Sequence, residues 1–183
     1  HARDAHKGKF GRAYIVAGST GMTGAPVMAA QAAVRSGAGL VTLGVPQPIW
    51  PIAAAKLDEA MVQPLPAGKD GLLELGAAPT VLERLNKYGV CLIGPGLGRS
   101  NAVYAVVRGI LQGTALPVVL DADGINALEG HIDVLDGRSG HCTILTPHDA
   151  EFKRLGGDLS HGDRLRAARD FALEHGCCLI LKG

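Results

Sequence analysis

Two carboxylates, Asp121 and Asp123, directly follow an apolar run and form the sequence Asp-x-Asp. Because side chains alternate along an extended chain, both carboxylates are expected on the same side locally, where they could hold Mg²⁺ directly or through water. A structural interpretation fits equally well: Asp123 caps the N-terminus of a helix and Asp121 is hydrogen-bonded in the turn. The spacing alone leaves both interpretations open.

Three further polar residues stand after apolar runs and could contact a ligand. His148 follows Pro147 in a loop, where a ring nitrogen could hydrogen-bond a substrate, although a lone loop histidine is often an ordinary surface residue. Glu151 could cap the first turn of the helix that follows. Lys182 stands at the end of the last apolar run, where its ammonium group could neutralise a phosphate or simply be solvated.

Residues 94–98 read GPGLG and place three glycines between an apolar run and Ser100, which stands where a helix N-cap belongs. Glycines let a backbone approach a ligand closely, and a helix N-terminus attracts anions, so this turn is a candidate phosphate cradle. A tight turn without a ligand is the alternative. The residues after Ser100 have the spacing of one apolar helix face: Val103, Val106, Val107, Ile110 and Leu111.

Two familiar phosphate-binding motifs do not match. The P-loop pattern Gly-x-x-x-x-Gly-Lys-Ser/Thr does not occur in the sequence. In GPGLGR, Arg99 stands where the dinucleotide fingerprint requires its last glycine, and no suitable acidic residue follows about 20 positions later. The sequence therefore excludes a P-loop protein and argues against a Rossmann dehydrogenase.

The candidate residues are separated by alternating strand and helix patterns. Strands are predicted at residues 12–17, 40–45, 60–65, 89–93, 117–121, 141–145 and 177–181. Helices are predicted between them, including an amphipathic one at 163–175 whose apolar face contains Leu165, Ala168, Phe171 and Ala172. This alternation predicts one α/β domain over residues 1–183, with a mainly parallel sheet and helices on both faces. In such sheets, ligands bind beyond the carboxyl ends of the strands, where AGSTGMTGA, GPGLGRS, DADGIN, TPHDAE and LKG would meet.

Bulk composition limits the partners of the chain. Among 183 residues, 18 are basic and 17 acidic, which gives a net charge of +1 and no electrostatic case for nucleic acid or an anionic membrane. No apolar run approaches the roughly 18 residues of a membrane span, and the charged first residues do not form a signal peptide, so we expect a cytoplasmic protein. The four cysteines, Cys91, Cys142, Cys177 and Cys178, stand in apolar contexts and are expected to be buried, reduced thiols.

Five motifs in this order resemble the ADP/ATP-dependent NAD(P)H-hydrate dehydratases, a branch of the ribokinase-like superfamily. They are HKGKFGRAYIVAGSTGMTGAPVMAAQAAVRSGAGLVTLGVP, GPGLGRS, VLDADGINAL, TPHDAEFKRL and the closing LKG. The resemblance implies a ribokinase-like three-layer α/β/α fold and a metabolite-repair hydro-lyase. Such an enzyme uses ADP or ATP, with Mg²⁺, to phosphorylate the ring hydroxyl of hydrated NADH or NADPH, and phosphate elimination then restores NAD(P)H.

The resemblance also assigns expected roles to individual residues. Ala25, Gly96, Gly98, His148 and Asn126 are expected to contact the hydrated cofactor, and residues 94–98 become the floor of its site rather than a phosphate cradle. Lys182 and Gly183 are expected to begin the nucleotide-binding segment. Asp123 lines the same cleft and is the candidate Mg²⁺ ligand.

The chain departs from the family pattern in two places. Asp149 and Ala150 replace the usual Pro-Gly before Glu151, which changes the turn and adds a negative charge near the substrate. The family's catalytic aspartate, in a Gly-x-Gly-Asp loop, does not occur in these residues, so the catalytic base is unassigned and expected beyond Gly183. We therefore expect a chain that lacks its C-terminal portion.

Other functions stay open at this point. A hydroxyethylthiazole or hydroxymethylpyrimidine kinase of the same superfamily would share the fold, although the opening motif argues against it. A non-catalytic nucleotide-binding module is the alternative from a different class. Family resemblance further suggests a homo-oligomer such as a tetramer, and fusion to or cooperation with an NAD(P)H-hydrate epimerase.

Overall fold

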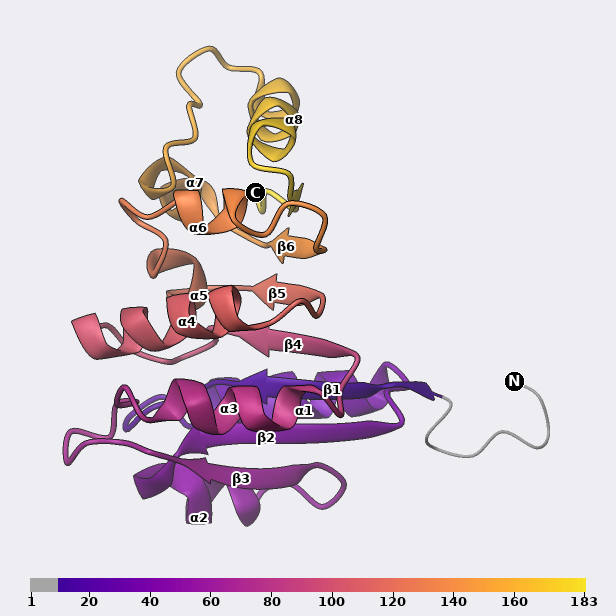
Figure 1. Cartoon of the computed structure of the whole chain (residues 1–183), viewed down its shortest axis with the longest axis vertical. Helices are drawn as coiled ribbons and strands as arrows, with labels where there is room; N and C mark the ends of the chain where they lie inside the picture. Colours follow the sequence, from indigo (N-terminus) through magenta and orange to yellow (C-terminus); the bar gives the residue numbers. More distant parts are fainter. Residues whose placement is uncertain (1–9) are drawn as a thin grey trace.

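The computed structural model describes residues 10–183, so the first residues of the opening motif lie outside the described part. Seven strands form one parallel sheet with the order β3-β2-β1-β4-β5-β6-β7 (Figure 1). The strands are β1 (Arg12–Val16), β2 (Leu40–Pro46), β3 (Met61–Leu65), β4 (Val90–Ile93), β5 (Val118–Leu120), β6 (Thr143–Leu145) and β7 (Cys178–Leu179). All seven predicted strands are confirmed, several with shorter bounds.

The helices connect successive strands and include several of only one turn. They are α1 (Gly24–Arg35), η2 (Gln47–Ile49), α2 (Trp50–Ala54), α3 (Ala77–Leu85), α4 (Asn101–Gly113), α5 (Asp123–Asn126), α6 (Asp133–Asp136), α7 (Asp149–Arg154) and α8 (Arg164–Glu174). Within residues 10–183, no helix is long and apolar enough to cross a membrane.

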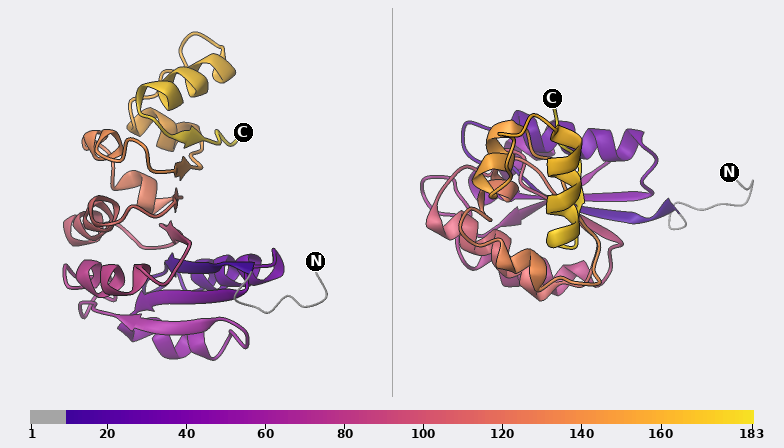
Figure 2. Two further views of the ribbon diagram at one scale, coloured as in Figure 1. Left: turned by 45° about the vertical axis from the view of Figure 1, so that its right-hand side comes forward. Right: turned by 90° about the horizontal axis from the view of Figure 1, so that it is seen from above.

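Two apolar clusters lie on opposite faces of the sheet, with helices on both sides (Figure 2). The larger cluster packs α3, α4, α6 and α8 on one face, and the smaller packs α1 and α2 on the other, over β1 to β3. On that second face, Leu92, Val119, Ile144 and Cys178 form one row across β4 to β7 and are only half-buried or exposed. The helical layer of the second face therefore covers the N-terminal half of the sheet more fully.

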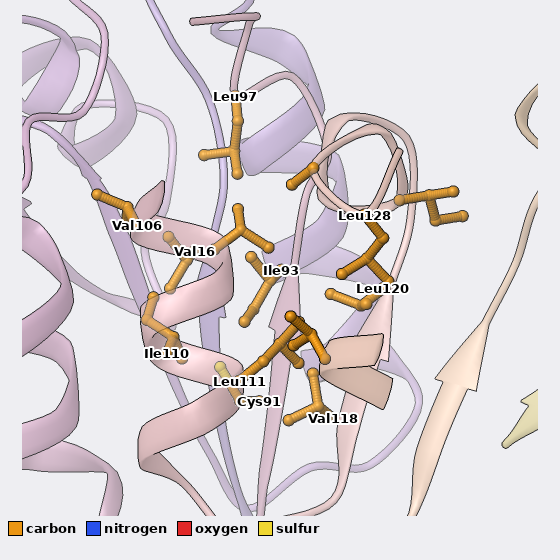
Figure 3. Close-up of a cluster of buried hydrophobic side chains, with 14 of the residues drawn as sticks. Val16, Cys91, Ile93, Leu97, Val106, Ile110, Leu111, Val118, Leu120 and Leu128 are labelled. Atoms are coloured by element: carbon orange, nitrogen blue, oxygen red, sulfur yellow. The ribbon is translucent and has the colours of Figure 1, made fainter. Parts of the chain in front are cut away.

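Helix α4 follows the predicted pattern in detail. The Ser100 side chain accepts a hydrogen bond from the Val103 N–H and so caps the helix. All five predicted apolar positions are buried. Figure 3 shows Val106, Ile110 and Leu111 beside Cys91 and Ile93 of β4. Burial of one continuous stripe fixes how α4 lies on the sheet and where its N-terminus meets the loop at residues 94–98.

The apolar face predicted for α8 is partly wrong. Phe171 is its only buried residue and stacks edge-on against Phe152, whereas Leu165 is 80% exposed. Ala168 and Ala172 are half-buried. The reason is the position of α8 at the end of the sheet, over the two-residue strand β7, where one aromatic residue makes most of the contact.

The predicted burial of the cysteines is also wrong for three of the four. Cys91 is buried in β4, but Cys142 and Cys178 are exposed and Cys177 is half-buried. Cys142 precedes β6, and Cys178 lies on the edge strand in the incompletely covered row. All four thiols are free.

Candidate active site at the carboxyl ends of the strands

The loops after β1 and β4 are joined by hydrogen bonds. The Gly18 N–H donates to Pro95 O at 2.8 Å, and the Ser19 hydroxyl donates to Gly96 O at 2.9 Å. A Cβ added to Gly96 would lie 3.1 Å from the Ala25 Cβ, so these two predicted substrate-contacting residues are neighbours. Because Gly96 has no side chain, its loop can pack close to the first turn of α1.

The loops after β4 and β5 approach each other backbone to backbone. Gly94 has φ +135°, and a Cβ there would lie 1.7 Å from Asp121 O. A Cβ at Gly124 would lie 2.4 Å from Ile93 O. Glycine is therefore required on both sides of this contact, which positions α5 beside the GPGLG loop.

The two aspartates of the Asp-x-Asp motif do not face the same partners, so the prediction from strand alternation is wrong. Ala122, between them, has φ +49°, a conformation that L-residues other than glycine rarely adopt. This turn sends the Asp121 carboxylate toward Thr146 and Lys182, and the Asp123 carboxylate toward Gly98 and Asn126. The capping alternative also fails for Asp123, because it is the first residue of α5 and the cap position is Ala122.

Asp121 connects the ends of β5, β6 and β7. Its Oδ1 accepts hydrogen bonds from Thr146 Oγ1 at 2.7 Å and from Lys182 Nζ at 2.9 Å. Partial burial disfavours the charged form, but the hydrogen bonds from Lys182 and Thr146 and the positive charge of Lys182 outweigh it, so the pKa of Asp121 is lowered. The predicted nucleotide-binding lysine is therefore already paired with a carboxylate.

Asp123 and Asn126 form a second polar cluster beside the glycine loop. The Gly98 N–H donates to Asp123 Oδ2 at 2.9 Å, and Asn126 Nδ2 donates to Asp123 Oδ1 at 3.1 Å. Arg99 Nε lies 3.5 Å from the same Oδ1, with its side chain 58% exposed. The Gly94 and Leu97 N–H groups also donate to protein carbonyls, of Val16 and Gly94 respectively. Much of the loop's donor capacity is thus used within the protein.

His148 and Glu151 form a capping box at the start of α7. His148 Nδ1 accepts from the Ala150 and Glu151 N–H groups at 3.1 and 3.4 Å, and the Glu151 carboxylate accepts from the His148 N–H at 2.9 Å. The predicted capping role of Glu151 is confirmed. The His148 side chain is 51% exposed, so part of the ring still faces solvent.

The negative charge of Asp149 is paired with Arg164, a residue that the sequence analysis did not single out. Arg164 forms an ion pair with Asp149 and also donates to Lys182 O at 2.9 Å. The Lys182 N–H donates to Pro147 O at 2.8 Å. The segment that contains His148 is therefore held beside Lys182. Arg164 lies on an exposed helix turn, where no local pattern distinguishes it from a solvated arginine.

Comparisons with known proteins identify the family of the chain. The family model described as "NAD(P)H-hydrate dehydratase" matches residues 13–183. The chain belongs to this dehydratase family. It is 43% identical over 181 residues to the bifunctional NAD(P)H-hydrate repair enzyme Nnr of Moorella thermoacetica. That alignment covers 97% of this chain but only 34% of the relative. The chain is 37% identical over 188 residues to the ADP-dependent (S)-NAD(P)H-hydrate dehydratase of Neisseria meningitidis, covering 100% of the chain and 59% of the relative.

Solved structures confirm the ribokinase-like fold. The ADP/ATP-dependent NAD(P)H-hydrate dehydratase of Bacillus subtilis, co-crystallised with ATP/Mg²⁺, superposes with a TM-score of 0.74 at 28% identity, over 100% of this chain and 61% of that one. A ribokinase-like superfamily protein of Enterococcus faecalis has a TM-score of 0.81 at 23% identity, again over 100% and 61%, and supports the fold alone. The chain thus spans about three fifths of the length of each of these two solved chains.

Within this dehydratase-family chain, residues 10–183 contain no group of three or more His, Cys, Asp or Glu side chains placed to hold a metal ion. The Asp123 carboxylate is occupied by Gly98 and Asn126, so its role as a Mg²⁺ ligand stays a prediction.

A cavity of about 540 Å³ lies elsewhere, between residues 156–163 and α8, with Phe171 and Glu174 in its lining. None of its lining residues belongs to the loops after β1, β4 or β5, so the candidate site is defined by the strand-end loops and not by this cavity.

Proposed function

We propose that the protein containing this chain is a nucleotide-dependent NAD(P)H-hydrate dehydratase. The ring hydroxyl of hydrated NADH or NADPH accepts the terminal phosphoryl group of ADP or ATP and releases its proton. Phosphate then leaves with the hydroxyl oxygen, and the adjacent ring carbon loses a proton, so that the C=C bond of NAD(P)H is restored. The observation that carries the proposal is the meeting of the β1 and β4 loops, with Gly96 against Ala25, in a chain of this family. The catalytic base stays unassigned.

The proposed site has a substrate side and a nucleotide side. The substrate contacts Gly96 and Gly98 in a loop whose N–H groups at residues 94, 97 and 98 are used internally, which suits a neutral ring better than a phosphate. The phosphates of the nucleotide lie instead near the Lys182 ammonium group. Mg²⁺ accompanies these phosphates, because the similar Bacillus subtilis dehydratase was co-crystallised with ATP/Mg²⁺. The proposed substrate-contacting residues are Ala25, Gly96, Gly98, Asn126 and His148, and the proposed nucleotide-binding residues are Lys182 and Gly183.

The first experiment measures substrate dependence in the full-length protein. We expect ADP or ATP to be consumed only when hydrated NADH or NADPH is supplied, with one dihydronicotinamide restored per phosphate released. Phosphate transfer to a thiazole or pyrimidine alcohol would instead identify a vitamin kinase. Nucleotide binding without turnover of either substrate would identify a non-catalytic module.

A second experiment separates the ligand role of His148 from its capping role. Asparagine is also a good N-cap, so His148→Asn keeps the start of α7, whereas His148→Ala loses it. We expect His148→Asn to retain the stability of the wild type but to raise KM for the hydrated cofactor by about tenfold, the effect of one lost hydrogen bond. Asp163→Asn, at the cap of α8, is the matched control. An unchanged KM in His148→Asn would leave His148 as a cap alone.

The relatives also suggest how the activity is organised. Several are named bifunctional repair enzymes, which supports fusion to, or cooperation with, an NAD(P)H-hydrate epimerase. A homo-oligomer such as a tetramer, and a cytoplasmic location, stay predictions. Light scattering of the purified full-length protein tests the first, and fractionation of cells tests the second.

A further inference from the structure

Arg154, at the end of α7, is connected to the glycine loop by three consecutive hydrogen bonds. Its Nη1 donates to Asn126 Oδ1 at 2.9 Å, and Asn126 Nδ2 donates to Asp123 Oδ1 at 3.1 Å. The other oxygen of Asp123 accepts from the Gly98 N–H at 2.9 Å. The guanidinium therefore reaches the backbone of a proposed substrate-contacting residue through two side chains.

The chemistry of the three side chains allows only this direction of bonding. A guanidinium can only donate and a carboxylate can only accept, so the amide of Asn126 must turn its oxygen to Arg154 and its nitrogen to Asp123. Asn126 is 3% exposed, which leaves little opportunity for water to replace either partner. Removal of Arg154 would leave a buried amide oxygen without its donor.

Other charged and titratable groups near Asp123 are less able to take over this role. Arg99 faces the same carboxylate from the loop, but its Nε is 3.5 Å away and its side chain is 58% exposed. Burial is the main cause of the raised pKa of Tyr104, on α4. The charges of Arg99, Asp123 and Arg154 have smaller effects on this pKa. Exposed ion pairs contribute little. We therefore expect the connection through the buried Asn126, whose hydrogen bonds are partly buried, to have the larger effect.

We infer that Arg154 is a positioning residue that holds Gly98, through Asn126 and Asp123, in the conformation required by the substrate. This inference rests on the proposed function. Helix α7 begins after His148 and ends at Arg154, six residues that span about 9 Å. One short helix thus supports both sides of the proposed substrate site: it presents His148 at its first turn and holds the glycine loop from its last.

The test compares Arg154→Met with Lys153→Met in the full-length protein. Lys153 is the exposed neighbour on the same helix, so its replacement removes one positive charge without touching the connection. In Arg154→Met we expect amide hydrogen exchange at Gly98 to accelerate about tenfold, as for one lost buried hydrogen bond, and KM for hydrated NADPH to rise by a similar factor. KM for the nucleotide and the exchange rates of β1 should stay at wild-type values, as should every parameter of Lys153→Met.

Two further variants keep the inference falsifiable if Arg154→Met folds poorly. Arg154→Lys retains one donor and should recover part of the Gly98 protection. In an Asn126→Leu background, Arg154→Met should cause no further acceleration, because the connection is already broken. Unchanged Gly98 exchange in Arg154→Met or additive effects in the double variant would overturn the inference. Absence of dehydratase activity in the wild type would refute the proposed function alone, since Gly98 exchange does not depend on turnover.

Discussion

At the scale of single residues, Asp121 shows how one charge joins loops that are far apart in the chain. Its carboxylate accepts from Thr146 and from Lys182, which come from the ends of two other strands. Neither partner is adjacent in sequence, and both contribute to the lowered pKa against the opposing effect of burial. The contact therefore stabilises the carboxyl-end surface only while Asp121 is charged.

This gives a pH-dependent prediction for Asp121→Asn. Because the native pKa is lowered, the carboxylate contributes stability above its unfolded pKa and loses that contribution as pH falls through the native value. We expect the variant to be less stable than the wild type at about pH 7, with a difference that shrinks toward about pH 3. Urea unfolding at both pH values measures it. Asp58→Asn, at an exposed site, is the control; an Asp121→Asn difference that is constant with pH would contradict the assignment.

The four thiols should differ sharply in reactivity. Burial raises the pKa of Cys91 to about 12, and burial with the neighbouring Cys178 raises that of Cys177 to about 11. Cys142 and Cys178 are exposed, and thiolates are the reactive form. In a chromogenic thiol assay of the native protein, Cys142 and Cys178 should react first and Cys91 only after unfolding. Cys142→Ser should remove one fast-reacting thiol, and fast labelling of native Cys91 would contradict the structure.

At the scale of elements, the contact between the β4 and β5 loops depends on glycine. Alanine in a helix is normally favoured over glycine by about 1 kcal/mol. At Gly124, however, a Cβ would lie 2.4 Å from Ile93 O, whereas at Gly137, the C-cap of α6, the nearest atom is 3.6 Å away. The same substitution is therefore expected to be costly at Gly124 and tolerated at Gly137.

We expect Gly124→Ala to lower the free energy of unfolding by about 1–3 kcal/mol through overpacking, and Gly137→Ala to be close to neutral. Chemical denaturation of both variants provides the measurement. Because Gly124 packs against Gly94, the first variant should also lower activity. Equal stability of the two variants would show that the loops can separate without cost.

Helices α4 and α8 show when a periodic sequence pattern is sufficient to predict which side chains of a helix are buried. The pattern of α4 predicted its buried face correctly, because that helix lies over the middle of the sheet and its whole stripe is covered. The pattern of α8 was just as regular, but Leu165 is exposed because the helix packs at the end of the sheet. Periodicity reports which residues share a face; the neighbours decide how much of that face is buried.

For the whole molecule, the order of the strands predicts a gradient of protection. Strand β4 pairs with β1 and β5 in the middle of the sheet, whereas β7 has two residues and pairs only with β6 among the described strands. Native-state hydrogen exchange should therefore be slowest in β1 and β4 and fastest in β7. Protection of β7 equal to that of β4 would indicate that a further element covers this edge.

The sequence by itself determined the α/β class, the alternation of strands and helices along the chain and the family, and it predicted which strand-end loops form the candidate site. These properties follow from local periodicity and from motifs that are contiguous in the chain. Only the tertiary structure decided the partners of the polar residues. The backbone turn at Ala122 separates the carboxylates of Asp121 and Asp123, and contacts between distant segments bring Lys182 to one and Gly98 to the other. Such pairings depend on how helices and strands pack, and no local pattern records them.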